Sequence, residues 1–245
     1  MGNGPDGGGR AGDEPVALFS GVESIDNGID IIRIFDALND PRNLESAIKF
    51  VKHYGGMCEA AISYTTSPVH NEEYFVKLAK TMEQMGADVI CIKDMAGLLT
   101  PYGTYDLVKA LKETVKVPIQ VHTHYTSGLG SMVLLKAVEA GADIIDTALS
   151  SMSGGTSQPA TETMAYVLRQ YGYDTGLDMD AVKKINDFFK PYRAKCLDSG
   201  LLNPVVMATD TDALGYQIPG GMLSNLVAQL TAQGKMDKFD EVLLE

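Results

Sequence analysis

The stretch EQMGADVICIKD (residues 83–94) decides the fold. A helical pattern ends at Gly86, and a run that is apolar at nearly every position then leads from Asp88 to a lysine and an aspartate. The stretch VEAGADIIDTAL (138–149) has a similar arrangement, which indicates a recurring unit of helix and strand. Short runs of this kind are typical of strands that are buried on both faces, as they are in parallel sheets.

Five apolar runs alternate with helical patterns and recur about every 25–30 residues. This alternation predicts an α/β fold with a parallel sheet. The rhythm stops beyond residue 175, where two more helices are expected: one over 177–196, kinked or ended near Pro191, and one after a turn within 216–235. The expected strands are 30–37, 60–66, 88–94, 118–124 and 143–149, and the expected helices are 41–55, 71–86, 101–115, 129–140 and 159–171.

The composition bounds the class of protein. The formal net charge of −12 argues against a surface for nucleic acid or a basic membrane-binding helix. The three cysteines are far apart and form no CxxC pair, which fits a reducing compartment. The chain also has no apolar run of membrane-spanning length and no signal-peptide pattern. We therefore predict a cytoplasmic location.

The chain is expected to divide into three segments. Residues 1–20 are rich in glycine and are predicted to be disordered, because such a segment buries too little apolar surface to offset the entropy of ordering it. Residues 21–175 hold the strand–helix pattern. Residues 176–245 are predicted to form a helical extension of the same domain.

Polar residues gather where the expected strands end. In a (β/α)8 barrel this end of the sheet carries the chemistry, and in an open doubly wound sheet it faces a ligand crevice. One of these residues, Asp36, either lines the pocket or caps the following helix, and the cap is the favoured interpretation. The residues are Asp36, Thr65, Thr66, Lys93, Asp94, His122, His124 and Thr147.

Two of the four histidines, His122 and His124, stand at positions i and i+2 of an expected strand. Their side chains should therefore point to the same face of the sheet. Two imidazoles on one face can share a metal ion such as Zn²⁺. The alternative is that both are structural and form hydrogen bonds to loops, and an isolated HxH motif by itself favours this alternative.

Lys93 ends the neighbouring strand and should lie beside this pair. A lysine among apolar strand residues should have a lowered pKa, because burial disfavours its charge. An uncharged amine can add carbon dioxide and become a carbamate, which would supply a third metal ligand. The alternative is a lysine that extends to solvent and pairs with Asp94.

Six motifs occur in the order found in one enzyme family. Together they resemble the carboxyltransferase domain of biotin-dependent enzymes, such as the oxaloacetate decarboxylase alpha subunit, the separate B-type subunit of pyruvate carboxylase and the methylmalonyl-CoA carboxyltransferase 5S subunit. The resemblance runs from about residue 26 to the C-terminus. The motifs are RIFDALND, SYTTSPVH, CIKDMAGLLTPY, VHTHYTSGL, GGTSQPATE and IPGGMLSNL.

The resemblance implies a TIM barrel with a helical extension, and a metal-dependent reaction. In this family a divalent metal, usually zinc and sometimes cobalt or manganese, is held by two histidines, a carboxylated lysine and an aspartate. His122, His124 and Lys93 match three of these ligands. The reaction moves a carboxyl group between oxaloacetate or pyruvate and biotin, by way of a pyruvate enolate that the metal stabilises. The biotin is carried on another domain or subunit.

Ser224 matches a hydroxyl residue of the family, which has threonine in its PGGxxTN motif. The resemblance implies that this hydroxyl moves a proton between biotin and the pyruvate methyl group, and thus that Ser224 contacts both. Serine keeps the hydroxyl. Ser224 is also expected to be the N-cap of the following helix.

The sequence departs from the family at its N-terminal end. A closed barrel needs eight strands, and the pattern supplies five, which match strands 4–8 of the family. The RDAHQS motif, whose aspartate is the fourth metal ligand, has no counterpart, and neither does the biotin-domain motif AMKM. We therefore expect an N-terminally truncated, partial barrel. Its open edges and apolar inner face would need cover from a homo-oligomer or a complementing chain.

Three functions are compatible with these features. The first is a biotin-dependent carboxyltransferase acting on oxaloacetate or pyruvate. The second is a metal-dependent acyl-CoA lyase or aldolase of the same barrel superfamily, in which the third protein ligand is the first-strand aspartate. The motifs CIKDMAG and PGGMLSN favour the first. The third is a remnant that binds a metal or a partner without turnover.

Overall fold

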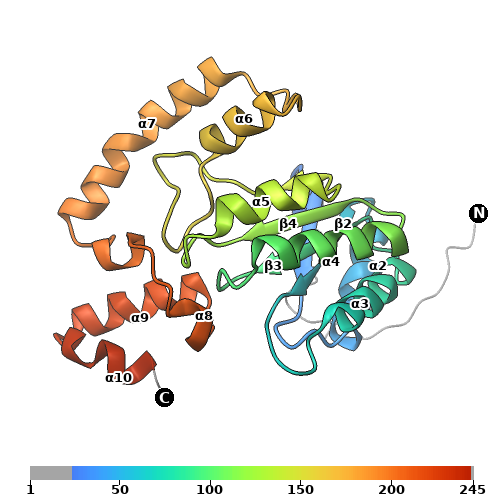
Figure 1. The fold of residues 1–245 in the computed structure, drawn as a ribbon, viewed down its shortest axis with the longest axis horizontal. Helices are drawn as coiled ribbons and strands as arrows, with labels where there is room; N and C mark the ends of the chain where they lie inside the picture. The colour runs from blue at the N-terminus through green and yellow to red at the C-terminus, as the bar shows by residue number, and fades with distance from the viewer. Residues whose placement is uncertain (1–23, 244–245) are drawn as a thin grey trace, which may run out of the picture.

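The computed structural model describes residues 24–243 (Figure 1). Five parallel strands form one sheet in the order β1-β2-β3-β4-β5, so each strand pairs with its neighbour in the sequence. The predicted α/β class and the number of strands are confirmed. The predicted disorder of residues 1–20 lies outside the described residues, and the division near residue 175 stays a prediction. The strands are β1 Ile31–Phe35, β2 Met57–Ser63, β3 Val89–Asp94, β4 Ile119–Thr123 and β5 Ile144–Ile145.

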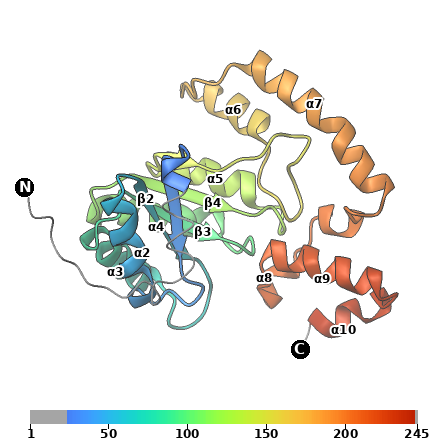
Figure 2. The same cartoon turned by 180° about the vertical axis from the view of Figure 1, so that it is seen from behind.

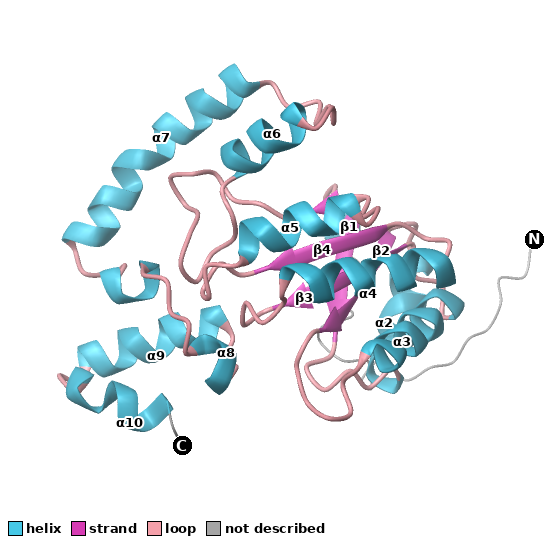
Figure 3. Ribbon diagram, viewed as in Figure 1, coloured by secondary structure: helices cyan, strands magenta, loops and turns pink. Residues whose placement is uncertain are grey.

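Four helices follow the first four strands and pack on one face of the sheet (Figures 1 and 3). The strand residues that face them, such as Ile62, Ile92 and Val121, join one hydrophobic core with the inner sides of the helices. Two of the helices begin at side-chain caps, since Asn71 accepts the N–H of Tyr74 and Thr100 accepts the N–H of Gly103. The helices are α2 Arg42–His53, α3 Glu72–Gln84, α4 Pro101–Thr114 and α5 Gly130–Glu139.

The opposite face of the sheet is concave and carries most of the polar residues of the strands, whereas Asp94 and Thr123 lie on the helix side. Arg33 of β1 contacts Asp146, which directly follows β5, at 2.8 Å. In a flat sheet four steps of about 4.8 Å would separate these strands by about 19 Å, more than the two side chains can span. The sheet therefore curves strongly, as an arc of a barrel does. Figure 2 shows β1, in blue, in front of the remaining strands on this side.

The fifth strand is shorter than predicted, because only Ile144 and Ile145 pair with β4. Asp146 still donates its N–H to the carbonyl of Val121, but the chain then leaves the sheet. Ala148 pairs instead with the segment before α6 (Thr161–Gln170): it receives the N–H of Thr161 and donates its own N–H to Pro159. Beyond the strand, the apolar residues Ala148 and Leu149 of this pattern are only partly buried.

Pro191 does not end the long helix α7 (Met179–Asp198), contrary to one of the two predicted outcomes. Proline lacks an N–H and crowds the preceding turn. Side chains on both sides of Pro191 hold the helix to the loop after β5. Asn186 accepts the N–H of Ser151 at 2.7 Å, and Arg193 donates to the carbonyl of Ser151 at 2.7 Å. These tertiary contacts offset the local cost of the proline.

The C-terminal segment, residues 204–243, follows α7 and consists of shorter helices. The sequence pattern does not reveal several of them. They lie on the side of the sheet where β3 and β4 end (Figure 1). Ser224 is not an N-cap as predicted, because its helix already begins at Gly220. No helix among residues 24–243 is long and apolar enough to cross a membrane. The elements are 3-10 helix η1 Pro204–Met207, α8 Ala213–Tyr216, α9 Gly220–Ala232, 3-10 helix η2 Met236–Lys238 and α10 Phe239–Leu243.

Candidate functional site

The predicted site residues Lys93, His122 and His124 meet at the carboxyl ends of β3 and β4. Lys93 is the register partner of His122 across the two strands, so both side chains lie on the concave face. His124 follows β4 directly, and its N–H donates to the carbonyl of Asp94. The two imidazole rings are 5.1 Å apart between centroids and inclined at 69°.

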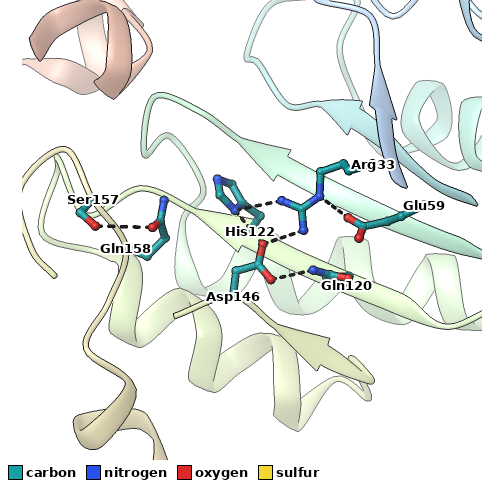
Figure 4. A network of polar contacts seen from close by, with 7 residues as sticks. All are labelled: Arg33, Glu59, Gln120, His122, Asp146, Ser157 and Gln158. Carbon is teal, nitrogen blue, oxygen red and sulfur yellow. Dashed lines mark hydrogen bonds and ion pairs between the residues drawn. The ribbon is translucent and has the colours of Figure 1, made fainter. Parts of the chain in front are cut away.

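His122 is held by a carboxylate that the sequence analysis did not single out. Its Nδ1 lies 2.8 Å from Oδ2 of Asp146 (Figure 4). Burial would raise the pKa of Asp146, but hydrogen bonds from His122 and Arg33 outweigh it and lower this pKa. An ionised carboxylate only accepts hydrogen bonds, so Nδ1 of His122 carries the proton. In the neutral ring Nε2 then has a free lone pair.

His124 is held in a similar way by a backbone carbonyl. Its Nδ1 lies 2.5 Å from the carbonyl oxygen of Thr156, which can only accept. Burial lowers the pKa of His124 to about 4, with His122 and the positive charge of Lys93 acting in the same direction. The ring is therefore neutral near pH 7, and its Nε2 also has a free lone pair.

Lys93 is half-buried, and burial lowers the pKa of its amine, with the positive charge of Arg33 adding to the effect. Its Nζ lies 4.1 Å from the centroid of the Phe35 ring. The pairing with Asp94 that the sequence left open is not formed. Asp94 points to the other face of β3, where it accepts the N–H groups of Leu98 and Leu99 at 2.9 Å each. Lys93 thus has the lowered basicity that the carbamate hypothesis requires.

Asp36 caps the turn before α2 rather than lining the site. Its carboxylate accepts the N–H groups of Leu38 and Asp40, at 3.0 and 2.9 Å, and the side-chain amide of Asn43 at 3.0 Å. The favoured prediction that Asp36 caps the helix is thus wrong in detail, because the N-cap of α2 is Pro41 and Asp36 accepts no backbone N–H of the helix.

Ser224 approaches the histidine pair through Thr156. The hydroxyl of Ser224 lies 2.8 Å from the hydroxyl of Thr156, whose carbonyl receives His124. The start of α9 packs closely here: a Cβ added to Gly220 would lie 2.9 Å from Nδ1 of His124. The N–H of Gly220 also donates to the carbonyl of Met95, directly after β3. The structure thus brings all four predicted site residues to one end of the sheet.

Several polar residues of the concave face were missed by the sequence analysis. Arg33 forms ion pairs with Glu59 and Asp146, and Gln120 donates to Asp146 at 2.6 Å (Figure 4). A signal for three of them is present in the sequence. Arg33, Glu59 and Gln120 each interrupt an otherwise apolar strand, and an isolated polar residue in such a run marks the face turned away from the helices. Thr156 and Gly220 lie in two of the motifs, GGTSQPATE and IPGGMLSNL, but nothing in these motifs marks either residue as a contact of His124.

The donor atoms fit a divalent metal ion only if Lys93 takes part. Among residues 24–243, no three side chains of His, Cys, Asp or Glu are grouped so that they could hold one ion. The two histidines have the support that metal-binding imidazoles usually have, in which the second ring nitrogen donates to a carboxylate or a carbonyl. Two imidazole nitrogens and an oxygen from a modified Lys93 would be a ligand set suited to zinc or its neighbours.

Comparisons with known proteins identify the family of the chain. Residues 35–189 match the HMGL-like family model, and residues 214–245 match the model of a conserved carboxylase domain. The chain is 54% identical over 224 residues to the B-type subunit of pyruvate carboxylase from Methanocaldococcus jannaschii, which covers 91% of this chain and 39% of that protein. It is 48% identical over 227 residues to the methylmalonyl-CoA carboxyltransferase 5S subunit of Propionibacterium freudenreichii subsp. shermanii, covering 91% and 44%.

A solved structure is similar as well. The carboxyl transferase domain of Rhizobium etli pyruvate carboxylase superimposes with a TM-score of 0.83 at 32% identity, over 92% of this chain and 38% of that one. The chain therefore spans about two fifths of the length of these relatives. The parallel sheet is part of the barrel of this family. The residues that match the HMGL-like model make up more than half of this chain, so the chain belongs to the HMGL-like family.

Proposed function

We propose that this chain is the catalytic part of a biotin-dependent carboxyltransferase, which moves a carboxyl group between oxaloacetate or pyruvate and biotin. The observation that carries the proposal is the paired support of the two histidines. Nδ1 of His122 donates to Asp146 and Nδ1 of His124 donates to Thr156, so both rings keep Nε2 free as a ligand, and Lys93 is the register partner of His122. The resemblance to a pyruvate carboxylase subunit supports the substrate class.

In this proposal His122, His124 and Lys93 hold a divalent cation, with zinc the favoured choice over cobalt or manganese. The bound cation would supply Lewis-acid stabilisation of the negative charge on the pyruvate enolate. The protein supplies the fixed geometry. Because each ring is anchored through Nδ1, neither histidine has to reorient when the site is loaded.

Lys93 would reach its ligand form by reaction with dissolved carbon dioxide. Its neutral amine forms a bond from Nζ to the carbon of CO2, and one proton leaves to solvent, which gives a carbamate with one negative charge. Two features favour this reaction at Lys93, since burial and the positive charge of Arg33 both lower the pKa of the amine. A carbamate oxygen is then available to the cation.

Ser224 is the proposed proton carrier between biotin and the pyruvate methyl group. Its hydroxyl lies 2.8 Å from that of Thr156 and 3.0 Å from the carbonyl of Gly220, so the hydroxyl is positioned by two neighbours. The link from Ser224 through Thr156 to His124 favours this function over a lyase or aldolase of the same superfamily, as does the carboxylase-domain match of residues 214–245.

The partners follow from the reaction. Biotin would arrive on another domain or subunit, and the substrate would be pyruvate or oxaloacetate. We also propose that a second copy or a complementing chain covers the edge formed by β1, where Ile31 and Phe35 remain about half exposed. The proposed location is the cytoplasm.

The full 245-residue chain with Lys93→Ala tests the proposal, with Lys112→Ala as the control. Lys112 is an exposed lysine that pairs with Asp143, remote from the histidines. After incubation with ¹³C-bicarbonate, a carbamate NMR signal and bound Zn²⁺ are expected in the wild type and in Lys112→Ala. Both should be lost in Lys93→Ala, together with any decarboxylation of oxaloacetate. A Lys93→Ala variant that keeps the signal and the zinc would refute the role of Lys93.

A further inference from the structure

We propose that Asp146 is a positioning residue that sets the tautomer of His122, and that Arg33 and Gln120 hold Asp146 in place for this purpose. The inference rests on the metal site of the proposed function and assigns a role to three residues outside it. Its effect is to direct Nε2 of His122, rather than Nδ1, toward the cation.

The carboxylate of Asp146 receives three donors, from Arg33 of β1 and from Gln120 and His122 of β4. Oδ2 receives Nδ1 of His122 and Nη2 of Arg33, at 2.8 Å each. Oδ1 receives Nε2 of Gln120 at 2.6 Å. The backbone is held too, because the N–H of Asp146 donates to Val121. Because Oδ2 of Asp146 is the acceptor for Nδ1 of His122, we assign Asp146 to the support of this histidine rather than to the cation itself.

Two residues compete for Nδ1 of His122. Besides Asp146 at 2.8 Å, Nη1 of Arg33 lies 3.4 Å from the same atom. A guanidinium only donates, so a hydrogen bond from Arg33 would require an unprotonated Nδ1 and would put the proton on Nε2. That tautomer blocks Nε2 as a ligand. The shorter contact to an acceptor selects the opposite tautomer, since 3.4 Å exceeds the usual N–H hydrogen-bond range.

Glu59 keeps Arg33 directed to Asp146. It pairs with Nε of Arg33 from β2, so that one guanidinium bridges two carboxylates on opposite sides (Figure 4). The side chain of Glu59 is only 7% exposed. A partly buried guanidinium that pairs with two carboxylates is expected to have little freedom to turn toward His122. The whole group therefore favours a single ring state of His122.

The test compares Asp146→Ala with the wild type by two measurements on the full chain. The first is ¹⁵N NMR of the histidine rings without metal, with the His122 signals identified by their loss in His122→Gln. The wild type should show the Nδ1–H tautomer. In Asp146→Ala, Arg33 becomes the remaining partner of Nδ1, so the tautomer should change to Nε2–H while His124 keeps its own. The second is the Kd for Zn²⁺ by chelator competition, which should rise about 10–100-fold.

Asp143→Asn is the matched control, because it also removes a carboxylate next to β5. The carboxylate of Asp143 contacts Lys112 and the backbone N–H of Ile119 instead of His122. It should change neither measurement. The inference is overturned if wild-type His122 is the Nε2–H tautomer, or if Asp146→Ala keeps the Nδ1–H tautomer and a Kd within about threefold. A wild type that binds no Zn²⁺ would instead overturn the proposed metal function. The tautomer measurement alone would then support or overturn the role of Asp146.

Discussion

Two adjacent glycines at the start of α9 should respond in opposite ways to the same substitution. A methyl group at Gly220 would lie 2.9 Å from Nδ1 of His124 and 3.0 Å from the carbonyl of Thr156. At Gly221, which is exposed, it would meet nothing within 4 Å. Both residues lie within the first turn of the same helix. Comparison of Gly220→Ala with Gly221→Ala therefore separates the effect of packing against His124 from the effect of alanine on helix propensity.

The magnitude for Gly220→Ala follows from three contributions. Overpacking against a fixed ring and a backbone carbonyl costs about 1–3 kcal/mol. Loss of the His124–Thr156 hydrogen bond, if the ring gives way, adds about 1 kcal/mol. Alanine regains up to about 1 kcal/mol of helix propensity. The net loss in the free energy of unfolding is about 1–3 kcal/mol. Gly221→Ala should leave stability unchanged or raise it by up to about 1 kcal/mol.

Thermal unfolding of both variants measures this difference, since each kcal/mol corresponds to about 2–4 °C in Tm for a chain of this size. Gly220→Ala should also weaken Zn²⁺ binding, because it displaces the acceptor that orients His124. Equal Tm and equal Kd in the two variants would refute the conclusion that the start of α9 packs against the histidine.

Three other residues give separate expectations. Folding lowers the pKa of His124 from 6.5 to about 4, so protonation of this ring favours the unfolded state. The free energy of unfolding should therefore be at its full value above pH 6.5. It should fall by up to about 3 kcal/mol as the pH drops toward 4. His124→Gln should flatten this part of a pH series of urea unfolding curves, and an unchanged slope would contradict the shift. Asn39 exchanges two hydrogen bonds of 2.8 Å with the backbone of Ser63 and has a φ of 58°, so Asn39→Ala should cost about 2–4 kcal/mol and Asn39→Gly less in the same unfolding assay. In Asp94→Asn the side-chain NH2 group would face one of the two backbone N–H donors, Leu98 or Leu99, that the carboxylate now accepts. The free energy of unfolding should fall by about 1–3 kcal/mol, measured as a lower Tm. An unchanged Tm would show that the carboxylate is dispensable.

The sheet and its helices could be predicted because their signals are local. The strands are largely apolar because one of their faces packs on the helices, and two of the helices begin at caps that the sequence shows, Asn71 and Thr100. The proximity of Lys93 and His122 could also be predicted from local information, since neighbouring parallel strands have their carboxyl ends side by side. These are the parts of the fold in which neighbours in sequence are neighbours in space.

The remaining features depend on distant contacts. The helix α7 passes Pro191 because Asn186 and Arg193 bind the loop after β5, and nothing in residues 177–196 encodes that loop. The role of Asp146 depends on the curvature of the sheet, which brings β1 near β5. A linear pattern shows that Arg33 and Asp146 are polar, but it does not show which of them touches His122.

Thr156 links the histidine site to the helices near the C-terminus. Its carbonyl receives His124, its hydroxyl contacts Ser224, and its N–H donates to the carbonyl of Val206. The preceding Gly155 adopts a φ of 55°, and a Cβ there would lie 2.1 Å from the same Val206 oxygen, so the loop fits only as glycine at this position. The acceptor for His124 is thus held on one side by the 3-10 helix η1 and on another by α9. The orientation of His124 therefore depends on the C-terminal helices as much as on β4, which directly precedes it.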